Sequence, residues 1–206
     1  MKWLQYGFMI LFHPIEIFYL IKRDRKNIPW MVSLFTLAIA VLIKTLTVYT
    51  VNYTVASKSA EQANALWELG MVVVPLLLWV VASYALMTIM GGESTFKETL
   101  TISTYSLVPY ILFTPLVIII SQVLSTSEAG FFNTLQNLLI VWMLILLFVG
   151  FKESNGLGFG AAIWRAFLSL IVMVLIAATF LLIFALGSQI VIFVQELTSE
   201  INYYLR

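Results

Sequence analysis

The sequence lacks cysteine altogether and has a single histidine among its 206 residues. Without cysteine there can be no disulfides, no thiolate nucleophile and no cysteine-ligated metal site. One histidine is too few for a histidine-rich metal centre, and the zinc-protease signature with two histidines is excluded for the same reason. We therefore predict that the protein holds no metal and no cofactor.

Charge is also scarce. Only 10% of the residues are Asp, Glu, Lys or Arg, whereas about a quarter are charged in ordinary globular domains. No two acidic residues lie inside one apolar run, and the sequence has neither a nucleophile elbow nor a phosphate-binding loop. The net charge of +1 gives no basic footprint for nucleic acid. We therefore predict no catalytic residues, no enzymatic activity and no nucleic-acid partner.

The sequence is instead rich in apolar residues, which make up 62% of the chain. A helix needs roughly 20 consecutive apolar residues to cross the hydrocarbon layer of a membrane. Five runs meet this requirement, and short polar links separate them. We predict an all-α membrane protein with a five-helix transmembrane bundle over residues 30–195 and a short tail over residues 196–206. The predicted spans are residues 30–51, 70–90, 102–124, 131–150 and 164–194.

The distribution of basic residues predicts an orientation, because cytoplasmic loops of membrane proteins carry an excess of Lys and Arg. Lys44 is set aside because it lies inside a predicted span. The other ten divide eight to two, which predicts a cytoplasmic N-terminus and an extracytoplasmic C-terminus. The larger group is Lys2, Lys22, Arg23, Arg25, Lys26, Lys97, Lys152 and Arg165, and the smaller is Lys58 and Arg206.

Residues 1–29 form a separate N-terminal segment. Residues 3–21 are nearly all apolar, but His13, Pro14 and Glu16 interrupt them. Pro14 removes a backbone hydrogen bond, and a glutamate within lipid is costly. We predict a break at His13-Pro14 and then a second short helix, so that the segment lies in the interface or re-enters the membrane. The alternative is a sixth span with the N-terminus outside.

A basic cluster closes this N-terminal segment. Ile17, Phe18 and Ile21 share one face of the second short helix, and the cluster follows at once. Such a segment is held in the interface by apolar contact and by attraction to anionic lipid. The basic cluster comprises Lys22, Arg23, Arg25 and Lys26.

Lys44 is the only charged residue in the interior of a predicted span, since Arg165 lies at the very start of the last one. Lys44 lies about 21 Å beyond Trp30 along a helix, which places it in the outer half of the membrane. Its side chain either reaches outward to water or lines a polar cavity, and a charge at this depth is a functional candidate. Amides within lipid hold helices together and are plausible partners for it. The outer amides of the fourth span are Asn133, Gln136 and Asn137.

The third span is predicted to be irregular. Thr95 and Glu98 have the spacing of a capping box, so a helix is expected to begin there. Pro109 and Pro115 each remove a backbone hydrogen bond, and Pro109 frees the carbonyl of Tyr105. Broken helices line substrate sites in transporters. They also occur in bundles that transport nothing, so both interpretations stay open.

Two sequence segments resemble the Yip family, which is named for interaction with Ypt/Rab small GTPases. They are the GGESTFKETL stretch at residues 91–100 together with YSLVPY at 105–110, and His13-Pro14 ahead of a basic Ile-Lys-Arg segment. The resemblance covers about residues 10–195, and the compact form is similar to bacterial members. It implies a five-span integral membrane protein without known catalysis, and it gives Tyr105 and Pro109 a structural role. Eukaryotic relatives take part in vesicle traffic.

Three functional hypotheses follow. The first is a non-enzymatic scaffold or accessory subunit in a bacterial plasma membrane, and the resemblance to bacterial members implies ABC-type importers as one class of partner. The second is a transporter or channel with a polar cavity near Lys44 and the Pro109/Pro115 break. The third is a lipid- or curvature-sensing protein that works through residues 14–26. The expected partners are the lipid bilayer and other membrane proteins, or further copies of the chain.

Overall fold

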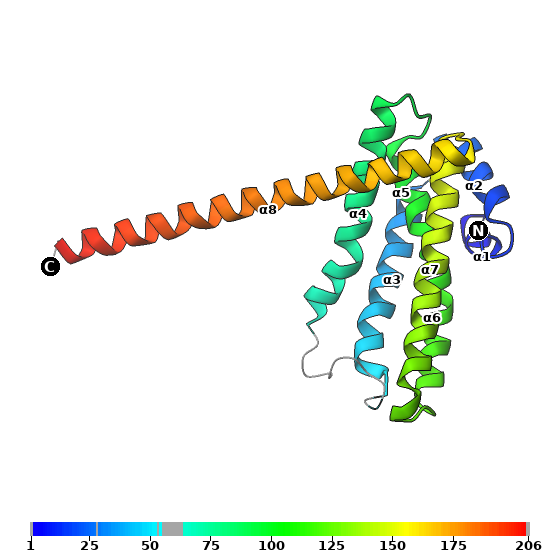
Figure 1. Cartoon of the computed structure of the whole chain (residues 1–206), viewed down its shortest axis with the longest axis horizontal. Coiled ribbons are helices and arrows are strands. Elements are labelled where there is room, and N and C mark those ends of the chain that lie inside the picture. The colour runs from blue at the N-terminus through cyan, green and yellow to red at the C-terminus, as the bar shows by residue number, and fades with distance from the viewer. Residues whose placement is uncertain (1, 28, 53, 55–63, 205–206) are drawn as a thin grey trace.

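The computed structural model describes residues 2–27, 29–52, 54 and 64–204, and every regular element within these residues is a helix. Figure 1 shows long helices that run side by side and one that crosses them. The long helices are α3 (Trp30–Thr50), α4 (Ala65–Ile89), α7 (Ala129–Ser154) and α8 (Phe159–Tyr204), and α5 (Phe96–Tyr105) and α6 (Val108–Ser121) follow one another. The short elements are α1 (Lys2–Met9), α2 (Pro14–Arg23), η1 (Arg25–Asn27) and η3 (Thr126–Glu128).

The predicted fold class is confirmed. Within the described residues, five helical segments are long and apolar enough to cross a membrane. Four of them begin five or six residues earlier than the apolar runs suggest. At three of these starts a polar residue, Asn64, Thr95 or Ser125, caps the first turn of the helix. The five segments are Trp30–Thr50, Ala65–Ile89, Phe96–Ser121, Thr126–Ser154 and Phe159–Thr198.

The third span is broken, as predicted, between α5 and α6. The Thr95 side chain accepts a hydrogen bond from the backbone N–H of Glu98, and the Glu98 side chain accepts one from Thr95, which completes the capping box. Pro109 lies in the first turn of α6, where its missing N–H costs nothing. Pro115 lies inside α6 and does not end it. The break therefore coincides with Pro109 alone.

The N-terminal segment folds as a hairpin of α1 and α2, which we call the N-terminal hairpin (residues 2–23). Its helices have 8 and 10 residues and are separated by a turn before Pro14, as predicted. At 1.5 Å per residue they measure about 12 and 15 Å, too short to cross about 30 Å of hydrocarbon. Neither helix is among the five segments that are long and apolar enough to cross, which favours the interfacial or re-entrant segment over a sixth span.

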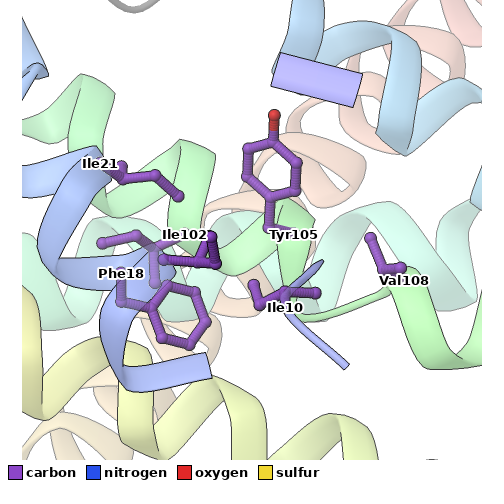
Figure 2. Close-up of a cluster of buried hydrophobic side chains, with 7 residues drawn as sticks. Ile10, Phe18, Ile21, Ile102, Tyr105 and Val108 are labelled. Carbon is purple, nitrogen blue, oxygen red and sulfur yellow. The ribbon is translucent and has the colours of Figure 1, made fainter. Parts of the chain in front are cut away.

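The apolar face of α2 packs against protein, whereas the sequence favours contact of this face with the membrane interface. Ile17, Phe18 and Ile21 are buried and pack with Ile102 and Tyr105 of α5 (Figure 2). Helix α2 also lies against α7. The hairpin is therefore part of the bundle, and only its outer side is left to meet lipid.

Helix α5 is the innermost element. Its residues from Glu98 to Tyr105 are all buried, and it contacts α2, α3, α4 and α7. Most of these residues are polar or hydroxyl-bearing, so the centre of the bundle is polar along α5 and apolar around it. Ser33 of α3 and Thr101 of α5 share a buried hydrogen bond of 2.9 Å between their hydroxyls.

Helix α8 crosses the other long helices and extends far beyond them (Figure 1). Its first half packs on α4, where Ala162 and Ser169 are fully buried and allow close approach. From Ala178 to Val194 every side chain is exposed. The predicted last span at 164–194 lies within the apolar segment Phe159–Thr198. The same helix continues to Tyr204, so the described part of the predicted tail at 196–206 is helical, and the helix does not run alongside the others. At 46 residues it is about 69 Å long.

Candidate functional site

The first of two polar centres is built on the loop between α4 and α5, which we call the motif loop (residues 90–95). Gly91 has φ +73°, a left-handed conformation that favours glycine. A Cβ on Gly92 would lie 2.6 Å from Met87 Cε and 2.7 Å from Asn155 Oδ1. The two glycines therefore have separate roles, one for the turn and the other for close approach to α7.

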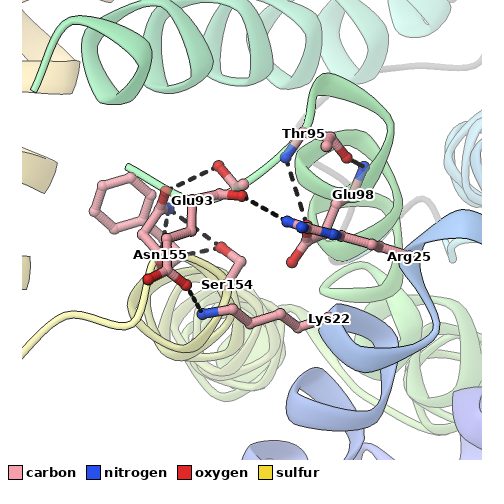
Figure 3. Close-up of polar contacts among 9 residues, drawn as sticks. Lys22, Arg25, Glu93, Thr95, Glu98, Ser154 and Asn155 are labelled. Carbon is pink, nitrogen blue, oxygen red and sulfur yellow. Dashed lines mark hydrogen bonds and ion pairs between the residues drawn. The ribbon is translucent and has the colours of Figure 1, made fainter. Parts of the chain in front are cut away.

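The motif loop is bonded to the end of α7. Ser94 Oγ donates a hydrogen bond of 2.8 Å to Asn155 Oδ1, and Asn155 Nδ2 donates one of 2.9 Å to the carbonyl of Phe151 (Figure 3). Asn155 is 5% exposed. These contacts fix the turn from α7 into α8 against the start of α5.

The motif loop is also bonded to the N-terminal hairpin and η1. Lys22 Nζ lies 2.8 Å from Glu93 Oε2, and Arg25 Nη1 donates a hydrogen bond of 3.0 Å to the backbone carbonyl of Glu93 (Figure 3). The hydrogen bond from Lys22 and its charge lower the pKa of Glu93 from 4.5. The ion pair is thus present above pH 4.5 and is lost as the pH falls through the lowered pKa. Because the Glu93 side chain is 65% exposed, the pair orients the hairpin more than it stabilises it.

Glu98 lies below this loop and is fully buried. Its Oε2 accepts a hydrogen bond of 3.5 Å from the backbone N–H of Thr95. Its Oε1 has no hydrogen-bond partner among the described residues. The hydroxyls of α5 bond largely to backbone carbonyls of the same helix, for example Thr101 to Lys97 and Thr104 to Thr101. This centre has the character of a structural polar core, without a paired base and nucleophile in the part of the chain that the structure describes.

The second polar centre surrounds Lys44 within the membrane span. Lys44 Nζ lies 3.7 Å from Glu68 Oε2, and the Glu68 side chain is only 5% exposed. Tyr110 of α6 lies near Thr47 and Glu68, so three helices contribute to the site. We call this set (Lys44, Thr47, Glu68 and Tyr110) the Lys44 centre.

The outer amides of α7 do not supply the partner of Lys44. Asn133 and Asn137 are exposed and Gln136 is half-buried on α7, whereas Lys44 pairs with Glu68 of α4. The apolar run of the second span begins at Gly70, which left Glu68 in the preceding polar link. The missed signal was Asn64, whose side chain accepts hydrogen bonds from Leu66 and Trp67 and starts α4 before Glu68.

Some of the remaining candidate residues from the sequence are buried in the bundle, and others lie on its surface. Tyr105 is buried with the N-terminal hairpin, Pro109 is buried beside it, and Pro115 is exposed on α6. Arg23 lies 3.8 Å from Asp24, and the side chain of Lys26 lies outside the described residues. Tyr110, which follows Pro109 directly, places the first turn of α6 near Thr47 and Glu68.

A comparison with protein families bears on the whole arrangement. A model of the Yip1 domain matches residues 8–191, from the N-terminal hairpin into the exposed half of α8. The chain belongs to the Yip1 family. No curated protein and no solved structure matches it. Both polar centres lie within the Yip1 domain of this chain, and the motif loop that suggested the family connects its N-terminal hairpin with its last helices.

Proposed function

We propose that this Yip1-family membrane protein acts without catalysis, as a scaffold or accessory subunit of another membrane complex. The exposed half of α8, from Ala178 to Val194, carries the proposal. Its side chains are apolar apart from Thr179, Ser188 and Gln189, and all are exposed. A single unaccompanied apolar helix of this length is suited to pack against helices of another membrane protein.

The attachment of α8 supports this role. Its first half is held on α4, and the preceding turn is fixed by Asn155 and the motif loop. The exposed half is therefore a rigid continuation of an anchored helix and not a loose tail. A partner that packs on it would be held at a defined position relative to the bundle. Membrane subunits of ABC-type importers are one class of partner, and self-association is the alternative.

A photo-crosslinking residue tests the accessory role. Phe184, which is 76% exposed, is replaced by a photoreactive phenylalanine analogue in native membranes. We expect adducts with a different membrane protein, identified by mass spectrometry. The matched control is Phe113, which stacks on Trp142 with ring centroids 5.4 Å apart and is expected to give none. Adducts only with lipid, or only with a second copy of the chain, would contradict the accessory role.

A transporter or channel is the second candidate, and the Lys44 centre is the observation that favours it. A charge pair beside a proline break is a feature of intramembrane substrate sites. Tyr110 and Thr114 flank that region of α6, and Thr114 is 2% exposed.

The natural absence of cysteine allows the two candidates to be separated. Thr114→Cys is expected to resist a membrane-impermeant, water-soluble thiol reagent, because the scaffold interpretation predicts a dry bundle at this depth. Asn133→Cys, on the exposed side of α7, is the accessible control and is tested with reagent on each side of the membrane. Labelling of both variants at similar rates would replace the scaffold by a water-filled path through the Lys44 centre.

A further inference from the structure

An apolar groove separates the N-terminal hairpin from α3. Its volume is about 480 Å³, within the range of small-molecule sites. Phe8 of α1 and Met31 and Phe35 of α3 form its walls, and they are 63%, 81% and 60% exposed. Tyr105 and Val108 form its floor, and both are buried. The groove is thus open at its sides and closed at its base.

The lining of the groove is suited to a hydrocarbon chain. Its only polar side chains are the hydroxyls of Thr36 and Tyr105, and Thr36 Oγ1 already donates a hydrogen bond of 2.9 Å to the Val32 carbonyl. The α3 residues that line it extend to Ile39, well inside the first membrane span. A polar ligand would lose its hydrogen bonds to water in this groove without gaining hydrogen bonds to the protein, whereas an acyl chain has no such hydrogen bonds to lose.

A cationic segment adjoins one end of the groove. The chain passes from the hairpin through η1 into α3, and Met31 of the groove wall follows this link directly. Residues 22–26 contain four basic residues and one acid. Lys22 is engaged by Glu93, but the Arg23 side chain is 64% exposed. Such a segment attracts anionic headgroups, by about fivefold in affinity per cation.

We propose that this groove binds one anionic phospholipid, with an acyl chain against Tyr105 and the phosphate against the exposed Arg23 side chain. The apolar lining selects the chain, and the cations select the headgroup. The hairpin and α3 form opposite walls, so the bound lipid joins them. The site is independent of α8 and of any protein partner, and its test does not depend on the function proposed above.

Lipid retention by the purified full chain tests the proposal. Native mass spectrometry in mild detergent, with added phosphatidylglycerol or phosphatidylcholine, is expected to show one retained phosphatidylglycerol. Two variants separate the contributions. Arg23→Gln should weaken phosphatidylglycerol about fivefold, the contribution of one cation, and leave phosphatidylcholine unchanged. Arg25 is kept because it positions the motif loop.

The second variant fills the groove. A Cβ on Gly7 would lie 3.7 Å from Tyr105 Cε1, an ordinary contact. Gly7 lines the groove, so Gly7→Leu is expected to place its side chain in the apolar space. We expect at least a tenfold loss of phosphatidylglycerol retention with all cations present. Gly70→Leu is the matched control, since no atom lies within 4 Å of its added Cβ, and it should behave as the natural protein. Circular dichroism confirms that each variant is folded.

Three results would overturn the proposal. Equal retention of the two lipids would remove the headgroup selectivity. Normal retention by Gly7→Leu would show that the cations act on bulk lipid without the groove. Equal losses in Gly7→Leu and Gly70→Leu would show a general effect of leucine at glycine positions.

Discussion

Gly150→Val is expected to lower the unfolding temperature of the purified protein further than any other single substitution considered for this chain. A Cβ at Gly150 of α7 would lie 2.3 Å from Ile102 Cγ2 and 3.1 Å from Phe18 Cζ. Ile102 is β-branched and sits on the innermost helix, and Phe18 is fully buried. Neither side chain has space to move, so we expect a loss of about 3 kcal/mol or more, at the upper end for overpacked cores.

Gly130→Val is the control for this substitution. Both glycines belong to α7, but an added Cβ at Gly130 would have no atom within 4 Å. The measurement is thermal unfolding in detergent, followed by the fluorescence of the six tryptophans. If the unfolding temperatures of the two variants fell by similar amounts, the loss would come from valine replacing glycine in a helix. The close contact between the hairpin, α5 and α7 at Gly150 would then be contradicted.

Lys44→Met is expected to destabilise the bundle by about 3 kcal/mol, because it removes the ammonium group that lies 3.7 Å from the buried carboxylate of Glu68. The Glu68 side chain is 5% exposed, whereas that of Lys44 is 36% exposed. The loss of stability should therefore come mainly from the buried Glu68 carboxylate and only slightly from the more exposed Lys44. Combining Lys44→Met with Glu68→Leu removes both charges, and we expect it to restore most of the stability, as in other buried ion pairs replaced by apolar residues.

The same unfolding measurement completes a double-mutant cycle for the pair. Lys97→Met is the control, since Lys97 lies 5.7 Å from the Trp30 ring centroid at the membrane end of α5 and should cost about 0.5–1 kcal/mol. Additive losses in the Lys44 and Glu68 variants would mean that the two residues do not interact. Rescue by the double variant would assign the Lys44 centre a structural role.

Local features of the fold could be predicted from the sequence because their causes are local. The length of each apolar run determines a span, Pro14 determines where α2 begins, and the spacing of Thr95 and Glu98 determines the start of α5. Each of these causes acts within about one helical turn. The position of the buried face of α2, with Ile17, Phe18 and Ile21, follows from the helical period in the same way.

The contacts of the polar centres could not be predicted, because they join residues far apart in sequence. Ser94 and Asn155 are 61 positions apart, and nothing near Asn155 marks it as the partner of the motif loop. Glu68 was not recognised as part of the second span, because α4 begins at Ala65, before the apolar run that starts at Gly70. The direction of α8 was also beyond prediction, because a helix that is apolar on every side has no face that indicates where it packs.

The buried polar character of α5 imposes an order on biosynthesis. Ser33, which bonds Thr101, is synthesised before α5. The end of α7 and Asn155, which bonds Ser94, are synthesised about 50 residues after the end of α5, roughly 3–10 s later at ordinary elongation rates. During that interval Glu98 and the neighbouring hydroxyls lack the helix that encloses them, and lipid is a poor substitute. The nascent chain must therefore keep α5 at the translocon or in the interface until α7 is complete. The bundle therefore assembles after its helices have been inserted, and α5, its most polar helix, is enclosed only when α7 packs against it.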